Sequence, residues 1–204
     1  MKKAILFLIV FSILMSSSFV FASGNVNIFF GKKNIAEVKF YNSLDLEVDK
    51  QDEFGLMLDF NSSESSSLYF ALDFYSAKSD GIDFFVVDVF GNIIFEYVNT
   101  EYKTQEICVG VRKYVESKDF VSLFVGGGLG YFKGEISGRE TWFGPGGESD
   151  SAIGPWFCCG LSFNIENINL GLMVRWSYAE LDIKTIDAEA GGTHYGAFIG
   201  MHWD

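Results

Sequence analysis

The 204-residue sequence contains few of the residues that staple small secreted domains or build metal sites. It has three cysteines, two histidines and two prolines, and Cys158 and Cys159 are adjacent. Neighbouring residues of a strand point to opposite faces, so this spacing fits neither a disulfide framework nor the ligand pattern of a structural zinc site. We therefore expect the cysteines to be ordinary small side chains, and we predict no metal and no cofactor.

Basic residues are also scarce, with 15 lysines and arginines against 27 acidic residues and a formal net charge of −12. This balance disfavours nucleic acid as a partner, because a phosphate backbone is bound by clustered cations. A hydrophobic content of 49% and an aromatic content of 17% exclude a disordered chain. Neither His194 nor His202 accompanies a nucleophile motif such as G-x-S-x-G, so no enzymatic activity is predicted.

The N-terminal segment is typical of a secretory signal peptide. Lys2 and Lys3 precede an apolar stretch at 4–15, and Val20-Phe21-Ala22 supplies small residues at the positions before cleavage. We expect cleavage after Ala22, which leaves a single domain over 23–204. Beyond Ala22 the sequence has no run of about eighteen apolar residues, so no transmembrane helix is predicted.

Alternation with a period of two recurs along the rest of the chain, and it is the main sequence signal of a β-strand. In the segment 53–60, the bulky apolar side chains of Phe54, Leu56, Leu58 and Phe60 alternate with Glu53, Gly55, Met57 and Asp59. The predicted strands lie at 25–33, 53–60, 68–75, 105–115, 121–132, 151–165, 168–184 and 193–203. One face of each is bulky and apolar and the other is small, polar or charged, which predicts an all-β fold.

The connections between these segments differ in length in a regular way. The second, fourth and sixth are short (61–66, 116–119 and 166–167), and the other four are long (34–52, 76–104, 133–150 and 185–192). Segments of about ten residues with short turns at one end and long loops at the other are typical of bacterial outer-membrane proteins. We therefore predict a closed, antiparallel, up-and-down transmembrane β-barrel of eight strands.

The third long connection leaves a ten-stranded alternative open. Residues 82–90 and 93–98 are strand-like and flank Gly91-Asn92, which is a hairpin turn signal. We interpret them as an extension of the third and fourth strands above the membrane, and the alternative makes them two further membrane strands.

Three short motifs resemble the small bacterial outer-membrane β-barrel family. Gly127-Gly128-Leu129-Gly130-Tyr131 is similar to its glycine-rich strand, Gly110-Val111-Arg112-Lys113-Tyr114 to its G-x-R-Y strand, and 196–203 to its closing strand with a near-terminal aromatic residue. The resemblance implies residence in the cell outer membrane, insertion by the barrel-insertion machinery, and contact with outer-membrane lipid and lipopolysaccharide. It also implies a monomer.

Charged residues on the inward face of the predicted strands are the candidate site. The inward set holds both signs, and charges in a narrow interior of low dielectric are costly unless they are paired. We expect a polar network across the lumen, centred on Asp73, Arg112 and Arg175. The inward charged or titratable residues are Lys33, Glu53, Asp59, Asp73, Glu106, Arg112, Arg175 and His202. Asp59, Asp73, Glu106, Arg112 and Arg175 are the predicted network residues.

The first long connection is acidic, with Asp45, Glu47, Asp49, Asp52 and Glu53. It lacks the order and the glycine of an EF-hand, so we interpret it as a solvated loop rather than a calcium or lipopolysaccharide bridge. We expect a non-enzymatic outer-membrane barrel with a side-chain-filled lumen and long external loops for envelope or surface contacts. The alternatives are a passive pore for small polar solutes and a soluble calycin-like barrel that binds an apolar ligand.

Overall fold

The computed structural model describes most of the chain beyond residue 22. The described residues are 23–35, 38–40, 44–46, 50–61, 67–79, 85–87, 93–96, 100–118, 120–138, 148–183 and 186–203. The predicted signal peptide at 1–22 and the acidic residues Glu47 and Asp49 lie outside them. In the described part, no helix is long and apolar enough to cross a membrane.

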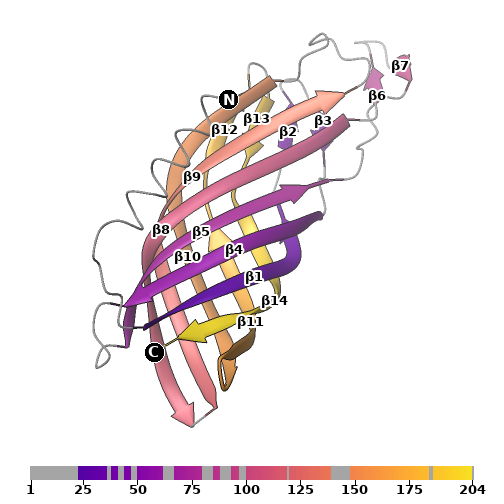
Figure 1. Ribbon diagram of the computed structural model, residues 1–204. Helices are drawn as coiled ribbons and strands as arrows, with labels where there is room; N and C mark the ends of the chain where they lie inside the picture. The colour runs from indigo at the N-terminus through magenta and orange to yellow at the C-terminus, as the bar shows by residue number, and fades with distance from the viewer. Residues whose placement is uncertain are drawn as a thin grey trace, which may run out of the picture.

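Eight long strands close into a single antiparallel barrel, in the order β1-β14-β11-β10-β9-β8-β5-β4 (Figure 1). Its strands are β1 (Ser23–Asn34), β4 (Gln51–Asn61), β5 (Leu68–Lys78), β8 (Thr100–Lys118), β9 (Val121–Gly138), β10 (Glu148–Ile165), β11 (Ile168–Ser177) and β14 (Gly192–Trp203). The first and last strands, β1 and β14, pair over eleven positions and close the barrel. The prediction of an eight-stranded up-and-down barrel is confirmed, and the ten-stranded alternative is wrong.

Six short strands belong to two further sheets outside the barrel. Their bounds are β2 (Val38–Phe40), β3 (Leu44–Leu46), β6 (Phe85–Val87), β7 (Ile93–Glu96), β12 (Glu180–Ile183) and β13 (Ile186–Glu189). β12, β13, β2 and β3 form a four-stranded sheet, and within the described ranges β6 and β7 form a separate two-stranded sheet. The strand-like segments of the third long connection thus form a separate small hairpin, not a continuation of the barrel strands.

All six short strands lie at the same end of the barrel (Figure 1). We call this the loop end, and the opposite end, which holds three short connections and Trp203, the turn end. The tightest turn is Glu166–Asn167, where Glu166 adopts a φ of 53°. The predicted asymmetry of short turns and long loops is therefore confirmed.

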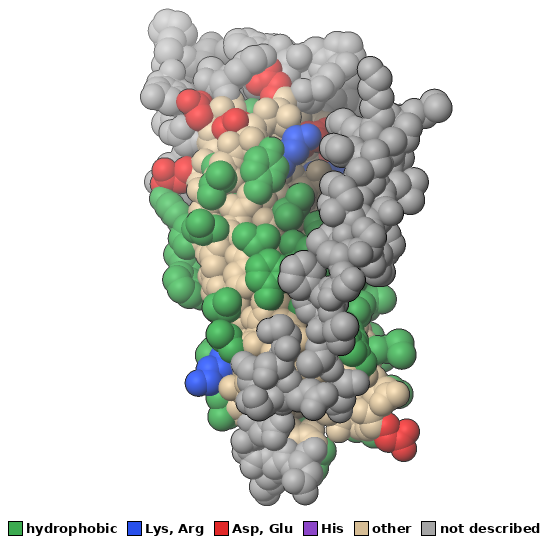
Figure 2. Space-filling view, turned by 60° about the vertical axis from the view of Figure 1, so that its left-hand side comes forward, with side chains coloured by type: hydrophobic (Ala, Val, Ile, Leu, Met, Phe, Trp, Pro, Cys, Tyr) green, Lys and Arg blue, Asp and Glu red, His purple; other side chains and the backbone are tan. Residues whose placement is uncertain are grey.

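Outward side chains of the barrel form an apolar belt, as period-two alternation requires. Outward residues such as Val109, Leu129 and Leu172 are 45%, 57% and 57% exposed. Figure 2 shows hydrophobic side chains gathered at mid-height, with charged side chains above and below them. A soluble barrel would solvate this face, so the exterior argues against the calycin-like alternative.

The lumen holds more bulk than the sequence suggested, because large aromatic side chains share the inward face with glycines. A Cβ at Gly110 would lie 2.7 Å from the Trp156 ring, and one at Gly130 would lie 2.8 Å from the Phe132 ring. Each missing side chain leaves room for an inward ring from another strand or from its own strand. The buried apolar residues of the lumen are Phe29, Met57, Ala71, Tyr75, Cys108, Tyr114, Phe124, Trp156, Cys158, Met173 and Phe198.

The strand predicted over 168–184 is interrupted. β11 ends at Ser177, and β12 begins at Glu180 in the sheet outside the barrel. Leu181 and Ile183 are buried while Glu180 and Asp182 are exposed, so burial keeps its period of two. The apolar side chains now stand at the buried positions, and the pairing partner changes. Alternation reports which side of a strand is buried and not which strand lies beside it.

Candidate functional site

The inward side chains of β8 lie in order along the lumen. From the loop end they are Tyr102, Thr104, Glu106, Cys108, Gly110, Arg112 and Tyr114, and all but Gly110 are buried. Two of them, Glu106 and Arg112, mark two separate groups of charged residues. We call these the Arg175 centre, nearer the loop end, and the Arg112 centre, nearer the turn end.

The Arg112 centre consists of Arg112, Asp59, Asp73 and Tyr114. The guanidinium donates from Nη1 to Asp59 Oδ1, and Nη2 lies 2.7 Å from Asp73 Oδ2. The Tyr114 hydroxyl donates to Asp59 Oδ2 at 2.6 Å. Both ion pairs are fully buried. Formally, one cation faces two carboxylates here, so the group depends heavily on its single arginine.

The Arg175 centre consists of Arg175, Lys33, Glu53, Glu106 and His194. Glu106 is held between two cations, with Lys33 Nζ 2.7 Å from Oε1 and Arg175 Nη1 2.7 Å from Oε2. Arg175 Nη2 also lies 3.3 Å from Glu53 Oε1. Two cations therefore balance two carboxylates. Lys33 makes two further contacts, to Thr104 Oγ1 at 2.9 Å and to the carbonyl of Ala190 at 2.5 Å.

His194 joins this centre through both ring nitrogens. Nδ1 lies 2.8 and 2.9 Å from the two carboxylate oxygens of Glu53, and Nε2 lies 2.9 Å from Ser177 Oγ. In the tautomer that satisfies Glu53, Nδ1–H donates to the carboxylate and Nε2 accepts from the hydroxyl. The order Ser177–His194–Glu53 matches that of a serine hydrolase relay. A nucleophile must also reach a substrate, and here Ser177 is completely buried.

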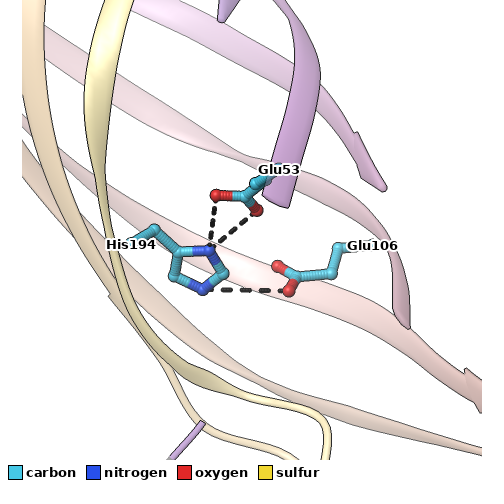
Figure 3. Close-up of side chains that lie close together, drawn as sticks. All are labelled: Glu53, Glu106 and His194. Carbon is cyan, nitrogen blue, oxygen red and sulfur yellow. Dashed lines mark hydrogen bonds and ion pairs between the residues drawn. The ribbon is translucent and has the colours of Figure 1, made fainter. Parts of the chain in front are cut away.

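Glu53, Glu106 and His194 also resemble a metal-binding group, since one ligand atom of each lies within 4.8 Å of the others (Figure 3). The charges around them do not fit a metal. Lys33 and Arg175 already neutralise both carboxylates, and a divalent ion would lie beside two buried cations in a medium of low dielectric. Lys33 Nζ has three oxygen partners and already pairs with Glu106, one of the three candidate ligands.

Tyr75 links the two centres. Its ring centroid lies 3.9 Å from the Arg175 guanidinium carbon, which is a close cation–π contact. Its hydroxyl donates to Asp73 Oδ2 at 3.3 Å. One aromatic side chain of β5 thus contacts a cation of the Arg175 centre and an anion of the Arg112 centre.

Apolar side chains cover the Arg175 centre on the loop side. This cluster is named the loop-end plug, and it consists of Ile35, Tyr102, Phe132, Ile136, Ala179, Leu181, Ile183, Ala188 and Ala190. Several of its members come from the four-stranded sheet and its flanks, so this sheet packs its apolar face on the barrel.

At the turn side of the lumen, hydrogen bonds between neutral side chains take the place of ion pairs. Asn169 Nδ2 donates to Asn27 Oδ1 at 3.0 Å, and Ser162 donates to Asn169 at 2.5 Å.

The five predicted network residues are all buried in the lumen, but they do not form one group. Asp59, Asp73 and Arg112 share one centre, while Glu106 and Arg175 belong to the other. The expected common centre of Asp73, Arg112 and Arg175 is therefore divided in two. Glu53, also assigned to the acidic loop, lies in the lumen, and Asp52 lies outside the barrel beside Lys32.

Sequence reasoning did not assign roles to His194, Ser177, Tyr75 or Tyr114. All four stand at inward positions of the alternation, which is the signal that could have included them. Their partners could not be inferred, because residues such as Ser177 and Glu53 are 124 positions apart in the sequence. His202, at the turn end, lies 3.1 Å from Asn25 through Nδ1 and belongs to neither centre.

No protein-family model and no curated protein matches the sequence. Solved structures are similar in fold. Neisserial surface protein A matches with a TM-score of 0.58 and 13% identity, over 88% of this chain and 96% of that one. The attachment invasion locus protein Ail of Yersinia pestis matches with a TM-score of 0.52 and 18% identity, over 89% and 98%. This chain has the fold of the eight-stranded outer-membrane β-barrels. The N-terminal barrel domain of Pseudomonas aeruginosa OprF is a third example, with a TM-score of 0.51 and 12% identity over 89% and 98%.

An outer-membrane barrel of this kind is embedded in lipid through its exterior. The apolar belt supplies that contact, and both charged centres lie on the other side of the barrel wall. A solute or a substrate could therefore reach the charged centres only through one of the two ends of the barrel. The loop-end plug closes one of these ends with apolar side chains.

Proposed function

We propose that the protein is a non-enzymatic outer-membrane anchor with a solid lumen, which presents its loop-end sheets outside the cell. The burial of the lumen charges supports this function most directly. Lys33, Arg112, Arg175 and His194 are all 0% exposed. A water-filled channel would leave such side chains accessible, because water lines the walls of a conducting pore.

The chemistry of the lumen also favours a structural role. Ion pairs in both centres and the apolar plug fill the space that a solute or a substrate would need. Buried charges of this kind are satisfied by each other and specify one packing of the interior. The hydrolase-like order at Ser177 then serves to hold His194 and Glu53 in place.

We further propose export by the signal peptide at 1–22, cleavage after Ala22, insertion by the barrel-insertion machinery, and a monomer with its loop end outward. Fractionation of cells and heat-modifiable migration on gels test this. The expected result is a heat-modifiable band in the outer-membrane fraction, with its N-terminus at Ser23. A protein that is soluble and monomeric without detergent would contradict it.

Conductance in planar bilayers tests the solid lumen. We expect no single-channel steps from the purified protein over a range of voltages. The variant Lys33→Met/Glu106→Gln removes one cation and one anion, so it leaves the net charge unchanged. It serves as a matched control because it keeps side-chain volume in the lumen. Regular steps from the wild-type protein would reject the solid lumen and favour the passive pore.

We propose that the loop end does not bind a polyanion. The structure of Ail was solved with the heparin analogue sucrose octasulfate. In this chain, Glu180 and Asp182 of β12 are exposed, and the register places them opposite Glu189 and Asp187 of β13. Such a surface repels a polyanion, so envelope or surface contacts at this sheet require partners of the opposite charge.

A further inference from the structure

Lysines lie just beyond the apolar belt on one side of the barrel. On β1, β5, β8 and β9, the first charged outward residue toward the loop end is a lysine. These four residues, the lysine rim, are Lys32, Lys78, Lys103 and Lys133. The strands that carry them are neighbours in the closed barrel, with β4 between β1 and β5. In the strand register these lysines are interleaved with acids, because Asp52 lies between Lys32 and Lys78. Glu135 lies opposite Lys103.

Three of these lysines are brought together by strand pairing. Lys78 lies directly opposite Lys103, and Gln105 lies opposite Lys133. Like charges at directly paired positions repel each other. Glu101 pairs with Lys78 at 2.8 Å and Glu135 with Lys133 at 3.6 Å. No ion pair of Lys103 is formed with a described residue. The four lysines of the rim stand against Asp52, Glu101 and Glu135, which leaves an excess of one positive charge.

Apolar side chains continue from this patch toward the middle of the belt. Ile107 and Val109 on β8 are each 45% exposed, and Tyr131 on β9 is 46% exposed. Cations that stand directly above a lipid-facing apolar surface lie at the depth of lipid headgroups. The patch is therefore continuous with the lipid interface already described.

We propose that Lys78, Lys103 and Lys133 bind the phosphate groups of a phosphorylated lipid in the outer leaflet, with its acyl chains on the belt below. Ammonium groups suit phosphate as point charges, and Gln105 adds a neutral donor between them. This inference rests on the proposed outward orientation of the loop end.

The two strands that follow β9 around the barrel, β10 and β11, have a different composition. On β10 and β11, the rings of Phe157, Trp176 and Tyr178 stack in a row, with centroids 6.1 and 6.3 Å apart. The hydroxyl of Tyr178 donates to Glu180. Aromatic rings and a carboxylate do not attract phosphate, so the lipid headgroup is expected on the lysine side only.

Native mass spectrometry of the purified protein in micelles tests this proposal. The titrants are diphosphorylated lipid A, its fully dephosphorylated form with the same acyl chains, and inorganic phosphate. We expect the phosphorylated lipid to bind at least about tenfold more tightly than the dephosphorylated one, because each lysine near a phosphorylated surface contributes roughly fivefold. Lys78→Gln/Lys103→Gln/Lys133→Gln should remove this preference, and the matching arginine variant should keep it.

Lys113→Gln is the matched control, because Lys113 is an outward lysine nearer the turn end, opposite Leu68 in the register. It should leave the preference unchanged. Lys103→Gln alone should weaken binding by roughly fivefold, and it breaks no ion pair of a described residue. Heat-modifiable migration verifies that each variant is folded.

Three results would overturn the proposal: equal binding of the two lipids, an equal loss in Lys113→Gln, or complete displacement of the lipid by an equal concentration of inorganic phosphate. The last result would indicate a site for free phosphate. The titration in micelles depends neither on conductance nor on which end of the barrel faces outward. A failure of the proposed function is therefore distinguished from a failure of this inference.

Discussion

The two charged centres of the lumen solve the same problem in different ways. The Arg112 centre draws on β4, β5 and β8, which are consecutive neighbours in the barrel. The Arg175 centre draws on β1, β4, β8, β11 and β14, and β9 and β10 separate Arg175 from Glu106 along the wall. The first joins adjacent strands, whereas the second reaches across the closed barrel.

Charge distinguishes them as well. Arg112 alone faces two aspartates, while Arg175 shares two glutamates with Lys33 and His194. The loss of one member should therefore be more costly in the Arg112 centre, where nothing described can take over the cation's role. The comparison indicates that the cost of losing one charged residue depends on whether another residue of opposite charge still pairs with its partners. It does not depend on how many residues the centre contains.

Arg112→Met should produce the largest loss of stability. It leaves Asp59 and Asp73 buried with no cation among their described contacts, and an uncompensated buried charge costs about 3–5 kcal/mol. Equilibrium urea unfolding in lipid vesicles, followed by tryptophan fluorescence, measures the effect. The triple variant Arg112→Met/Asp59→Asn/Asp73→Asn should recover most of the loss. If it is as unstable as the single variant, packing rather than charge explains the result.

Arg175→Met should cost less, roughly 2–3 kcal/mol, because Lys33 still pairs with Glu106 and His194 still contacts Glu53. The same unfolding measurement compares it with Arg112→Met. Adding Lys33→Met should remove the redundancy and bring the loss to at least that of Arg112→Met. An Arg175→Met variant less stable than Arg112→Met would contradict the argument from redundancy.

Substitution of Tyr75 should cause the smallest loss of stability, and it tests the coupling between the two centres. Tyr75→Phe loses the hydrogen bond to Asp73 and should cost about 1 kcal/mol. Tyr75→Leu also loses the ring over Arg175 and should cost roughly 1 kcal/mol more. In a double-mutant cycle, the Tyr75→Phe loss should vanish in an Asp73→Ala background. If Tyr75→Phe still loses stability in the Asp73→Ala background, the Tyr75 hydroxyl acts through a contact other than Asp73.

Much of the barrel could be predicted because alternation is a local property. Phe54, Leu56 and Leu58 face outward and Glu53, Met57 and Asp59 inward, as the pattern of 53–60 required. The eight strands and the placement of the short turns followed from segment and connection lengths. The end of β11 at Ser177 was missed, although the apolar pattern changes phase there. Trp176 and Tyr178 face outward, whereas Leu181 and Ile183 of β12 stand at the other parity and are buried in another sheet.

The sequence by itself therefore determined the strands, their inward and outward faces, and the burial of Asp59, Asp73, Glu106, Arg112 and Arg175. Only the tertiary structure decided which of these charges meet, since partners across a lumen depend on closure and register and not on spacing along the chain. It also decided the close match between inward rings and inward glycines, because each ring occupies space that the absence of a Cβ provides. The scarcity of cysteine, histidine and basic residues excluded several classes of protein, and the closed barrel showed how the few remaining cations are used.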